Sequence, residues 1–236
     1  MTPRRPLVFL LLALLLAGPA TSQDFPPRKP VTLVVGFAAG GAADAAARLM
    51  AKKLGENIGQ TVIIDNKAGA GGNIAHQQVA NGPVDGSVLL LGSIGPLTIA
   101  PHMMKLPYDP FKDLAPVSGG VYFPNALVVN ASSGIKTLAD FVALAKTKAD
   151  AVSFASTGSG SASHLAGELF AQRAGVEMLH VPYRGGAPAM QDLLGGRFTG
   201  YFAAPPTALP HLRSFPQAHT YSRKAQSLGS NEMEAE

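Results

Sequence analysis

Apolar runs rich in β-branched residues alternate along the chain with stretches that have the spacing of amphipathic helices. The first run, Val31-Thr-Leu-Val-Val35, leads through a Gly- and Ala-rich loop into a helix, and the same unit then repeats. The predicted elements are strands over 31–35, 61–65 and 87–91, helices over 43–58 and 70–81, and a turn over 82–86. The apolar side of the first helix is formed by Ala46, Leu49, Met50 and Lys53/Leu54. This alternation predicts βαβ units on a buried parallel sheet.

A Pro-rich, irregular stretch from 101 to 116 separates this series from a second one. Beyond it the chain is expected to run extended over 114–121 and 125–130. A helix follows over 137–148, with Thr137 as its N-cap and Asp140 in its first turn. A second β-α-β-α-β series is predicted over 152–155, 164–173, 177–181, 187–194 and 197–202. We therefore expect an α/β protein of two lobes, with boundaries at 25–113 and 114–212.

Two loops between a strand and a helix have the composition of anion-binding sites. Gly40 and Gly41 precede the first long helix, and Gly158-Ser-Gly-Ser161 precedes a helix in the second series. A helix that starts on such a loop presents unpaired N–H groups and the positive end of its dipole. Neither segment contains a lysine or arginine, from 36 to 47 or from 152 to 169. The pattern predicts one small anion held between two lobes by backbone N–H groups and the hydroxyls of Ser159 and Ser161, with Gly158 and Gly160 allowing close approach.

Other candidate ligand residues lie on neighbouring loops, and each has a purely structural alternative. Ser93 ends the third strand at the edge where ligands gather in open α/β sheets, and Gly71 extends the donor surface beside it. Asp44 either touches the ligand or caps the helix and organises the loop. Phe37 either packs on the ligand or belongs to the core, and His164 either lines the site or packs and caps. Tyr183 and Arg184 either line the mouth of the cleft or are solvated.

Composition limits the function classes. The chain has 236 residues, 47% hydrophobic and 14% charged, which is typical of a globular protein. Arg4 and Arg5 followed by an apolar run over 7–17 predict a signal peptide over 1–22, cleaved after Ala20 or Ser22. Its removal takes two arginines from a net charge of +4, leaving +2, which does not favour nucleic acid as a partner. The chain has no cysteine, so disulfide and thiolate chemistry are excluded.

Competing chemistries fit the sequence less well. Neither loop has the lysine of a P-loop, and Ser163 replaces the last glycine of a dinucleotide motif. A serine hydrolase could use Ser161 and His164, but Ser161 lacks the Gly-x-Ser-x-Gly elbow. The six histidines show no paired metal-ligand spacing, so we predict neither a metal nor another cofactor.

Several motifs in one order resemble the Bug family, the extracytoplasmic solute receptors of tripartite tricarboxylate transporters. The segments that carry the resemblance, within about 25–212, begin at Lys29-Pro-Val-Thr, Asp65-Asn-Lys-Ala, Leu106-Pro-Tyr-Asp, Ser161-Ala-Ser-His and His180-Val-Pro-Tyr-Arg. The resemblance implies a type II periplasmic-binding-protein clamshell that holds a small carboxylate between its lobes. It also implies transfer of that carboxylate to membrane subunits and a periplasmic location.

The segment 213–236 departs from the family pattern. It is polar, has no apolar periodicity and is expected to be disordered, whereas family members continue with a strand and helices that return to the first lobe. We therefore expect a receptor truncated at its C-terminus. The alternatives are a truncated remnant without transport function and the serine hydrolase considered above. Backbone donors recognise a carboxylate but do not identify which one.

Overall fold

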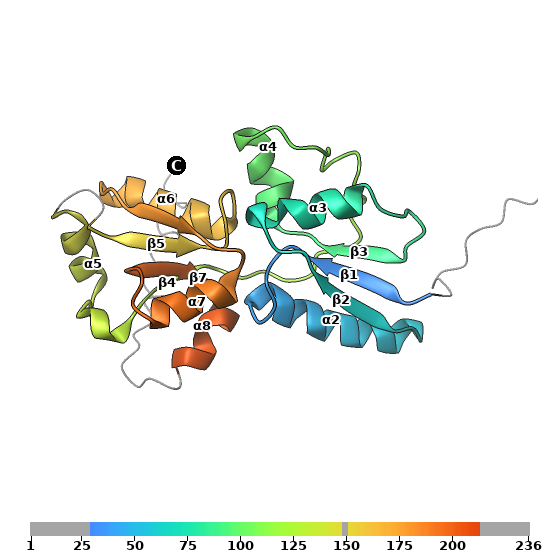
Figure 1. The fold of residues 1–236 in the computed structure, drawn as a ribbon, viewed down its shortest axis with the longest axis horizontal. Helices are drawn as coiled ribbons and strands as arrows, with labels where there is room; N and C mark the ends of the chain where they lie inside the picture. The colour runs from blue at the N-terminus through green and yellow to red at the C-terminus, as the bar shows by residue number, and fades with distance from the viewer. Residues whose placement is uncertain (1–28, 148–150, 213–236) are drawn as a thin grey trace, which may run out of the picture.

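A computed structural model of the chain describes residues 29–147 and 151–212, which form two α/β lobes lying side by side (Figure 1). The predicted signal peptide over 1–22 and the predicted polar tail over 213–236 lie outside the described residues. The two-lobed α/β fold predicted from the sequence is confirmed. No helix of the described residues is both long enough and apolar enough to cross a membrane.

Lobe 1 is built on a three-stranded parallel sheet of β1 (Val31–Val35), β2 (Val62–Asn66) and β3 (Val88–Leu91). Their order is β2-β1-β3, so the most apolar strand lies in the centre. The side chains of β1 are almost wholly buried, as the β-branched run predicts for a strand covered on both faces. The predicted strands and their parallel arrangement are therefore correct to within about one residue.

Two helices cover opposite faces of this sheet, α2 (Ala42–Ile58) and α3 (Asn73–Ala80), the latter preceded by the short turn η1 (Ala70–Gly72) (Figure 1). The predicted apolar side of α2 is wrong in part, because Leu49 is 73% exposed. The side against the sheet is formed by alanines instead, Ala42, Ala46, Ala47 and Ala51. Small side chains let the helix lie close to β1 and β2, and the larger apolar residues then fall outside that contact.

The stretch from 95 to 103 is helical, whereas the sequence predicted an irregular segment beginning at 101. It forms a π-helical turn, η2 (Gly95–Ile99), that continues into α4 (Ala100–Met103). Pro96 and Pro101 each lie in the first turn of their element, where no N–H is needed and the ring does not interrupt the helix. The rest of the predicted irregular stretch, 104–116, contains neither helix nor strand, so the prediction is wrong only for 101–103.

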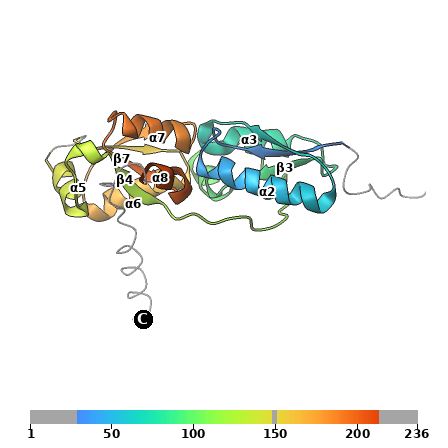
Figure 2. The same ribbon diagram turned by 90° about the horizontal axis from the view of Figure 1, so that it is seen from below.

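Lobe 2 contains a four-stranded sheet of β4 (Ala126–Val129), β5 (Ser153–Ser156), β6 (Leu179–Pro182) and β7 (Gly200–Ala203). The order is β4-β7-β5-β6, with β4 antiparallel to β7 and the other pairs parallel. The predicted strands are again found, shifted by up to about three residues. The chain reaches β4 through an exposed extended connection that runs beside lobe 1 (Figure 2).

Four helices and the turn η3 (Ala131–Ser133) complete lobe 2: α5 (Leu138–Ala145), α6 (Ala162–Ala174), α7 (Gly186–Leu194) and α8 (Pro205–Leu212). The predicted cap of α5 is confirmed, because Thr137 and Asp140 form a reciprocal capping box. The helix α8 was not predicted. It packs against α7 in its own lobe and against α2 in lobe 1, and so joins the two lobes.

Candidate functional site

The two lobes meet through the loops that follow their parallel strands, which we call the interlobe seam. In lobe 1 these are the first loop (residues 36–41), η1 and η2, and in lobe 2 they are the second loop (residues 157–161) and the loop 183–186. Glycines line the contact on both sides. A Cβ on Gly71 would collide with the carbonyl oxygen of Ser159, and one on Gly95 would lie 2.6 Å from the carbonyl oxygen of Gly160. The carboxyl ends of the strands therefore face a shared seam, where α/β proteins bind ligands.

The first loop docks on the loop 183–186 rather than on the second loop. The Ala38 N–H donates to the carbonyl oxygen of Arg184 over 3.0 Å, and a Cβ on Gly185 would lie 2.8 Å from the Ala38 nitrogen. Arg184 thus contributes its backbone to the seam while the residue as a whole stays exposed. Phe37 is half-buried, and its ring tip would lie 3.4 Å from a Cβ on Gly72 while its own Cβ would lie 3.4 Å from one on Gly185, which places Phe37 at the seam.

The carboxylate of Asp44 organises the first loop. It accepts from the Gly40 N–H over 3.0 Å, from two guanidinium nitrogens of Arg48 over 2.9 and 3.0 Å, and from Asn66 Nδ2 over 3.1 Å. Burial alone raises the pKa of Asp44, but the hydrogen bonds from Arg48, Gly40 and Asn66 outweigh it and hold that pKa below its ordinary value. Asp44 lies in the first turn of α2, whereas the N-cap residue is Gly41. Its carboxylate is thus occupied within lobe 1, and the interpretation of Asp44 as the N-cap itself is wrong.

The N-termini of α2 and α7 face each other across the seam. A Cβ on Gly41 would lie 3.4 Å from the Gly186 nitrogen and 3.6 Å from the Ala187 nitrogen. Within the described part of the chain, the N–H groups of these three residues have no hydrogen-bond acceptor, although Gly41 and Gly186 are buried. The next N–H of α2, on Ala42, donates to Thr207 Oγ1 of α8 over 3.1 Å. Two positive helix ends with buried, unpaired donors therefore meet at one place.

A buried hydroxyl adds to this set of unpaired donors. Ser93 Oγ is buried and, among the residues that the structure describes, is the one such side-chain atom without a hydrogen-bond partner. Its backbone N–H donates to Nε2 of the wholly buried His76 over 3.2 Å, so His76 carries its proton on Nδ1 and donates it to the Gly72 carbonyl over 2.9 Å. Burial lowers the pKa of His76 and keeps this arrangement neutral. Ser93 is thus held beside η1 and Phe37 with its hydroxyl unused.

The second loop uses most of its own N–H groups. Gly158 donates to Ser156 Oγ, Gly160 donates to His164 Nδ1 and Ser161 donates to the Gly158 carbonyl, at 3.1, 3.2 and 3.1 Å. The Ser161 hydroxyl is the N-cap of α6 and accepts from the His164 N–H over 3.3 Å. Of the predicted donors on this loop, only the N–H and the hydroxyl of the exposed Ser159 have no hydrogen-bond partner within 29–147 and 151–212.

Two predicted site residues lie elsewhere or act differently. The Tyr183 hydroxyl donates to Asp192 Oδ2 over 2.8 Å and its ring packs on Phe198 within lobe 2. Burial and this bond raise the pKa of Tyr183 to about 12. His164 accepts through Nδ1 from Gly160, so it does not activate Ser161 as a hydrolase would require. Thr207 was missed, because its role depends on an unpredicted helix.

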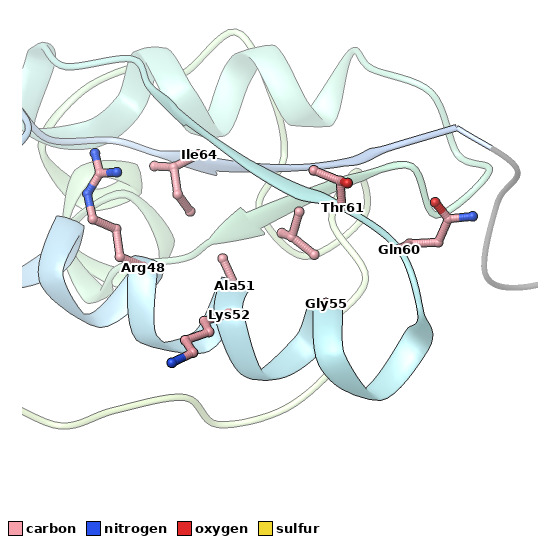
Figure 3. A pocket seen from close by; sticks show the side chains of 8 residues that line it. Arg48, Ala51, Lys52, Gly55, Gln60, Thr61 and Ile64 are labelled. Atoms are coloured by element: carbon pink, nitrogen blue, oxygen red, sulfur yellow. The ribbon is translucent and has the colours of Figure 1, made fainter.

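A groove of about 470 Å³ lies away from the seam, between α2 and β2 (Figure 3). Arg48, Lys52, Gln60 and Thr61 are among the residues that line it. Arg48 connects the groove with the first loop, because the same guanidinium binds Asp44. Within the described ranges no group of three or more His, Cys, Asp or Glu could hold a metal ion.

Comparison with known families assigns the chain to a class of proteins. Residues 46–218 match the model of the tripartite tricarboxylate transporter family receptor, TctC, which is most of the chain. The chain belongs to this family. It is a family of substrate-binding receptors and not of enzymes.

Curated relatives of this TctC-family chain include a protein of Pseudomonas sp. (strain P51) from the tcbD-tcbE intergenic region, which is 41% identical over 195 residues. BugT of Bordetella pertussis is 37% identical over 201 residues. The aligned regions cover 82% and 84% of this chain but only 58% and 61% of the relatives. The chain thus spans little more than half the length of the curated relatives it matches.

Solved structures similar to this TctC-family chain include MatC from Rhodopseudomonas palustris with bound malate, with a TM-score of 0.77 and 33% identity. An R. palustris protein with adipate has a TM-score of 0.76 and 35% identity. The first alignment covers 83% of this chain and 66% of MatC, and the second covers 84% and 66%. These likenesses confirm the predicted periplasmic-binding-protein fold.

Proposed function

We propose that the chain is a receptor that captures a small carboxylate at the interlobe seam. The observation that carries this proposal is the pair of facing helix N-termini at Gly41 and Gly186, with buried N–H groups that have no acceptor in the described residues. Buried unpaired donors cost free energy, and two positive helix ends repel each other. An anion at the seam removes both penalties at once.

The unpaired donors at the seam suit a carboxylate in number and kind. The N–H groups of Gly41, Gly186 and Ala187 can hold one charged group, and the unused hydroxyl of Ser93 supplies another donor. The solved relatives with malate and adipate show that proteins of this fold bind small dicarboxylates. Because this chain supplies no lysine or arginine from 36 to 47, recognition rests on backbone dipoles rather than on a basic cluster.

The proposal extends to location and partners. The predicted signal peptide over 1–22 and the family membership support a receptor that works in the periplasm. The family membership also supports delivery of the carboxylate to the membrane subunits of a tripartite tricarboxylate transporter. Neither a cofactor nor nucleic acid has a role in this proposal.

A thermal-shift screen of mono-, di- and tricarboxylates, followed by calorimetry on the best compound, tests the proposal. We expect a carboxylate to raise the melting temperature without being converted. Gly41→Val should weaken binding by about 1 to 3 kcal/mol, because the added side chain enters the space beside Gly186 and Ala187.

Gly119→Val is the matched control, because no atom lies within 4 Å of a Cβ at Gly119 in the exposed connection. It should bind like the wild type. Equal affinity of both variants would contradict a site at the seam. If no carboxylate stabilises the wild type, the alternative of a remnant without transport function is favoured.

A further inference from the structure

Two stacked histidine rings lie beneath the second loop. His164 comes from the first turn of α6 and His180 from β6, and their ring centroids are 4.0 Å apart with the planes inclined by 24°. Phe154 of β5 also stacks on His180, at 5.0 Å. Rings from three elements therefore form one small stack, which we call the histidine stack.

Each histidine of the stack holds one glycine of the second loop. Gly160 donates its N–H to His164 Nδ1 over 3.2 Å. Gly158 donates its N–H to Ser156 Oγ over 3.1 Å, and that oxygen lies 2.6 Å from His180 Nε2. The loop is thus held by one imidazole directly and by the other through a hydroxyl.

Both glycines also touch lobe 1. A Cβ on Gly158 would lie 2.9 Å from the backbone of Gly71, and the Gly160 carbonyl lies against Gly95. Both have positive φ, 128° for Gly158 and 75° for Gly160, a backbone conformation that depends on the bonds around it. A change in the histidine stack therefore acts directly on the seam.

The hydrogen bond from Gly160 exists only while His164 is neutral. An N–H can donate to Nδ1 only if that nitrogen carries no proton, so the proton of His164 is on Nε2, which faces Glu168 Oε1 at 3.5 Å. Protonation turns Nδ1 into a donor that faces the N–H of Gly160, and the bond is lost. Histidine is the side chain that makes this change near neutral pH.

The titratable groups that face His164 are few in the part of the chain that the structure describes. Glu168 on α6 is half exposed, so solvent screens its attraction for a protonated His164. His180 on β6 stays neutral, because burial and the proximity of His164 lower its pKa to about 4. The two β5 residues that contact His180, Phe154 and Ser156, carry no charge.

We propose that His164 is a positioning residue: in its neutral form it fixes the second loop at the seam, and its protonation releases that loop and weakens carboxylate capture. The part about capture rests on the proposed function. The part about the loop rests on the geometry of the stack alone. The receptor then holds its carboxylate most tightly while His164 is neutral.

The loop is tested without any carboxylate, by following the amide resonance of Gly160 in ¹⁵N-labelled protein as the pH is lowered from neutral. In the wild type we expect the resonance to move upfield as His164 gains its proton. In His164→Phe, which keeps a stacking ring but offers no acceptor, it should lie upfield at every pH. If the chemical shift of the Gly160 amide does not change with pH in the wild type, the positioning role proposed for His164 is overturned, whatever binds at the seam.

Capture is tested by calorimetry with malate over the same pH range. The wild type should bind malate about fivefold more weakly at the lower pH, the loss expected for one hydrogen bond. His164→Phe should bind weakly at both pH values, and His164→Asn, whose amide oxygen can accept from Gly160 but does not titrate, should bind tightly at both. His102→Asn, at an exposed histidine of α4, should behave like the wild type.

The outcomes separate the two proposals. Malate affinity that is independent of pH in the wild type, together with a Gly160 resonance that titrates, overturns the link between His164 and capture. If neither malate nor any carboxylate of the screen binds at either pH while Gly160 titrates, the proposed function fails and the positioning role of His164 is supported.

Discussion

The two glycine-rich loops of the seam have similar sequences but are held by different chemistry. The first loop is fixed by an ionised carboxylate, Asp44, which accepts from a loop N–H, a guanidinium and an amide. The second loop is fixed by neutral imidazoles and hydroxyls, through His164 and Ser156. A carboxylate with a lowered pKa keeps its charge down to acid pH, whereas an imidazole nitrogen that gains a proton can no longer accept a hydrogen bond. Similar loop sequences therefore give one constant and one pH-sensitive half of the same seam.

The largest difference between the loops should follow from removing Asp44. Asp44→Ala leaves the Gly40 N–H, Arg48 and Asn66 without their shared acceptor, and we expect the free energy of unfolding to fall by about 2 to 4 kcal/mol. Urea denaturation at neutral pH measures this. Glu56→Gln, which removes an exposed ion pair with Lys53, should change stability by less than about 0.5 kcal/mol. A loss as small as in that control would show that Asp44 does not hold the first loop.

The next effect concerns the contact between the second loop and lobe 1. Gly71→Ala introduces a Cβ that collides with the Ser159 carbonyl at a residue with φ of 63°, and should destabilise the protein by about 2 to 4 kcal/mol. Gly134→Ala has the same kind of strain, with φ of 78°, but no atom within 4 Å of its Cβ. It should cost about 1 to 2 kcal/mol. Small-angle scattering should show wider lobe separation for Gly71→Ala only, and an unchanged radius for both would exclude a closed seam.

The free energy of unfolding should depend on pH in two ranges, one set by His180 beside the second loop and a more acid one set by Asp44 beside the first. The pKa of His180 falls from 6.5 to about 4 on folding, so the unfolded chain binds the extra proton in this range. Stability is therefore full above about pH 6.5 and declines as the pH falls toward about 4, with a slope of up to about 1.4 kcal/mol per pH unit. The pKa of Asp44 is lowered from 3.8, so its contribution is lost only at more acid pH.

His180→Phe separates these windows, because it keeps a ring in the stack and removes the titration. We expect its stability, followed by denaturation from neutral to acid pH, to decline less steeply than that of the wild type above the window of Asp44. The remaining decline belongs to buried His76, whose pKa is also lowered by burial. A decline between about pH 6.5 and about pH 4 that is as steep as in the wild type would assign the acid sensitivity to another group.

The smallest effect should come from the link that α8 makes to the N-terminus of α2. Thr207→Val removes the oxygen that accepts the Ala42 N–H and should cost about 1 kcal/mol in urea denaturation. Thr98→Val, at an exposed hydroxyl that donates to the Ile94 carbonyl, should cost less than about 0.5 kcal/mol. Equal costs for the two variants would mean that the cap contributes nothing measurable.

The sequence predicted the elements whose signal is local. The β-branched run of β1 and the capping pair Thr137 and Asp140 are found where expected, because strand and cap preferences depend on near neighbours. The exposure of Leu49 could not be predicted from the helical spacing of apolar residues. That spacing does not show how closely the helix packs on the sheet, and therefore not which of its apolar residues are buried.

The site was predicted less completely than the fold. The glycine loops do lie at the seam, but sequence could not show that the N–H groups of Gly158 and Gly160 are already used by Ser156 and His164. Hydrogen-bond partners across different elements depend on tertiary packing. For the same reason the facing pair of Gly41 and Gly186 was not foreseen, because the two glycines are far apart in sequence.

The hydrogen bond between Ala42 and Thr207 joins residues that are 165 positions apart. This separation determines when the bond can form during synthesis of the chain. The sheet of lobe 1 and the helices that cover it are held by contacts among residues of lobe 1, so they can form while the rest of the chain is still emerging from the ribosome. The N-terminal end of α2 is completed only after α8 has been synthesised and has docked. The interlobe seam is therefore a late product of folding, and its long-range step coincides with the completion of the carboxylate site that we propose there.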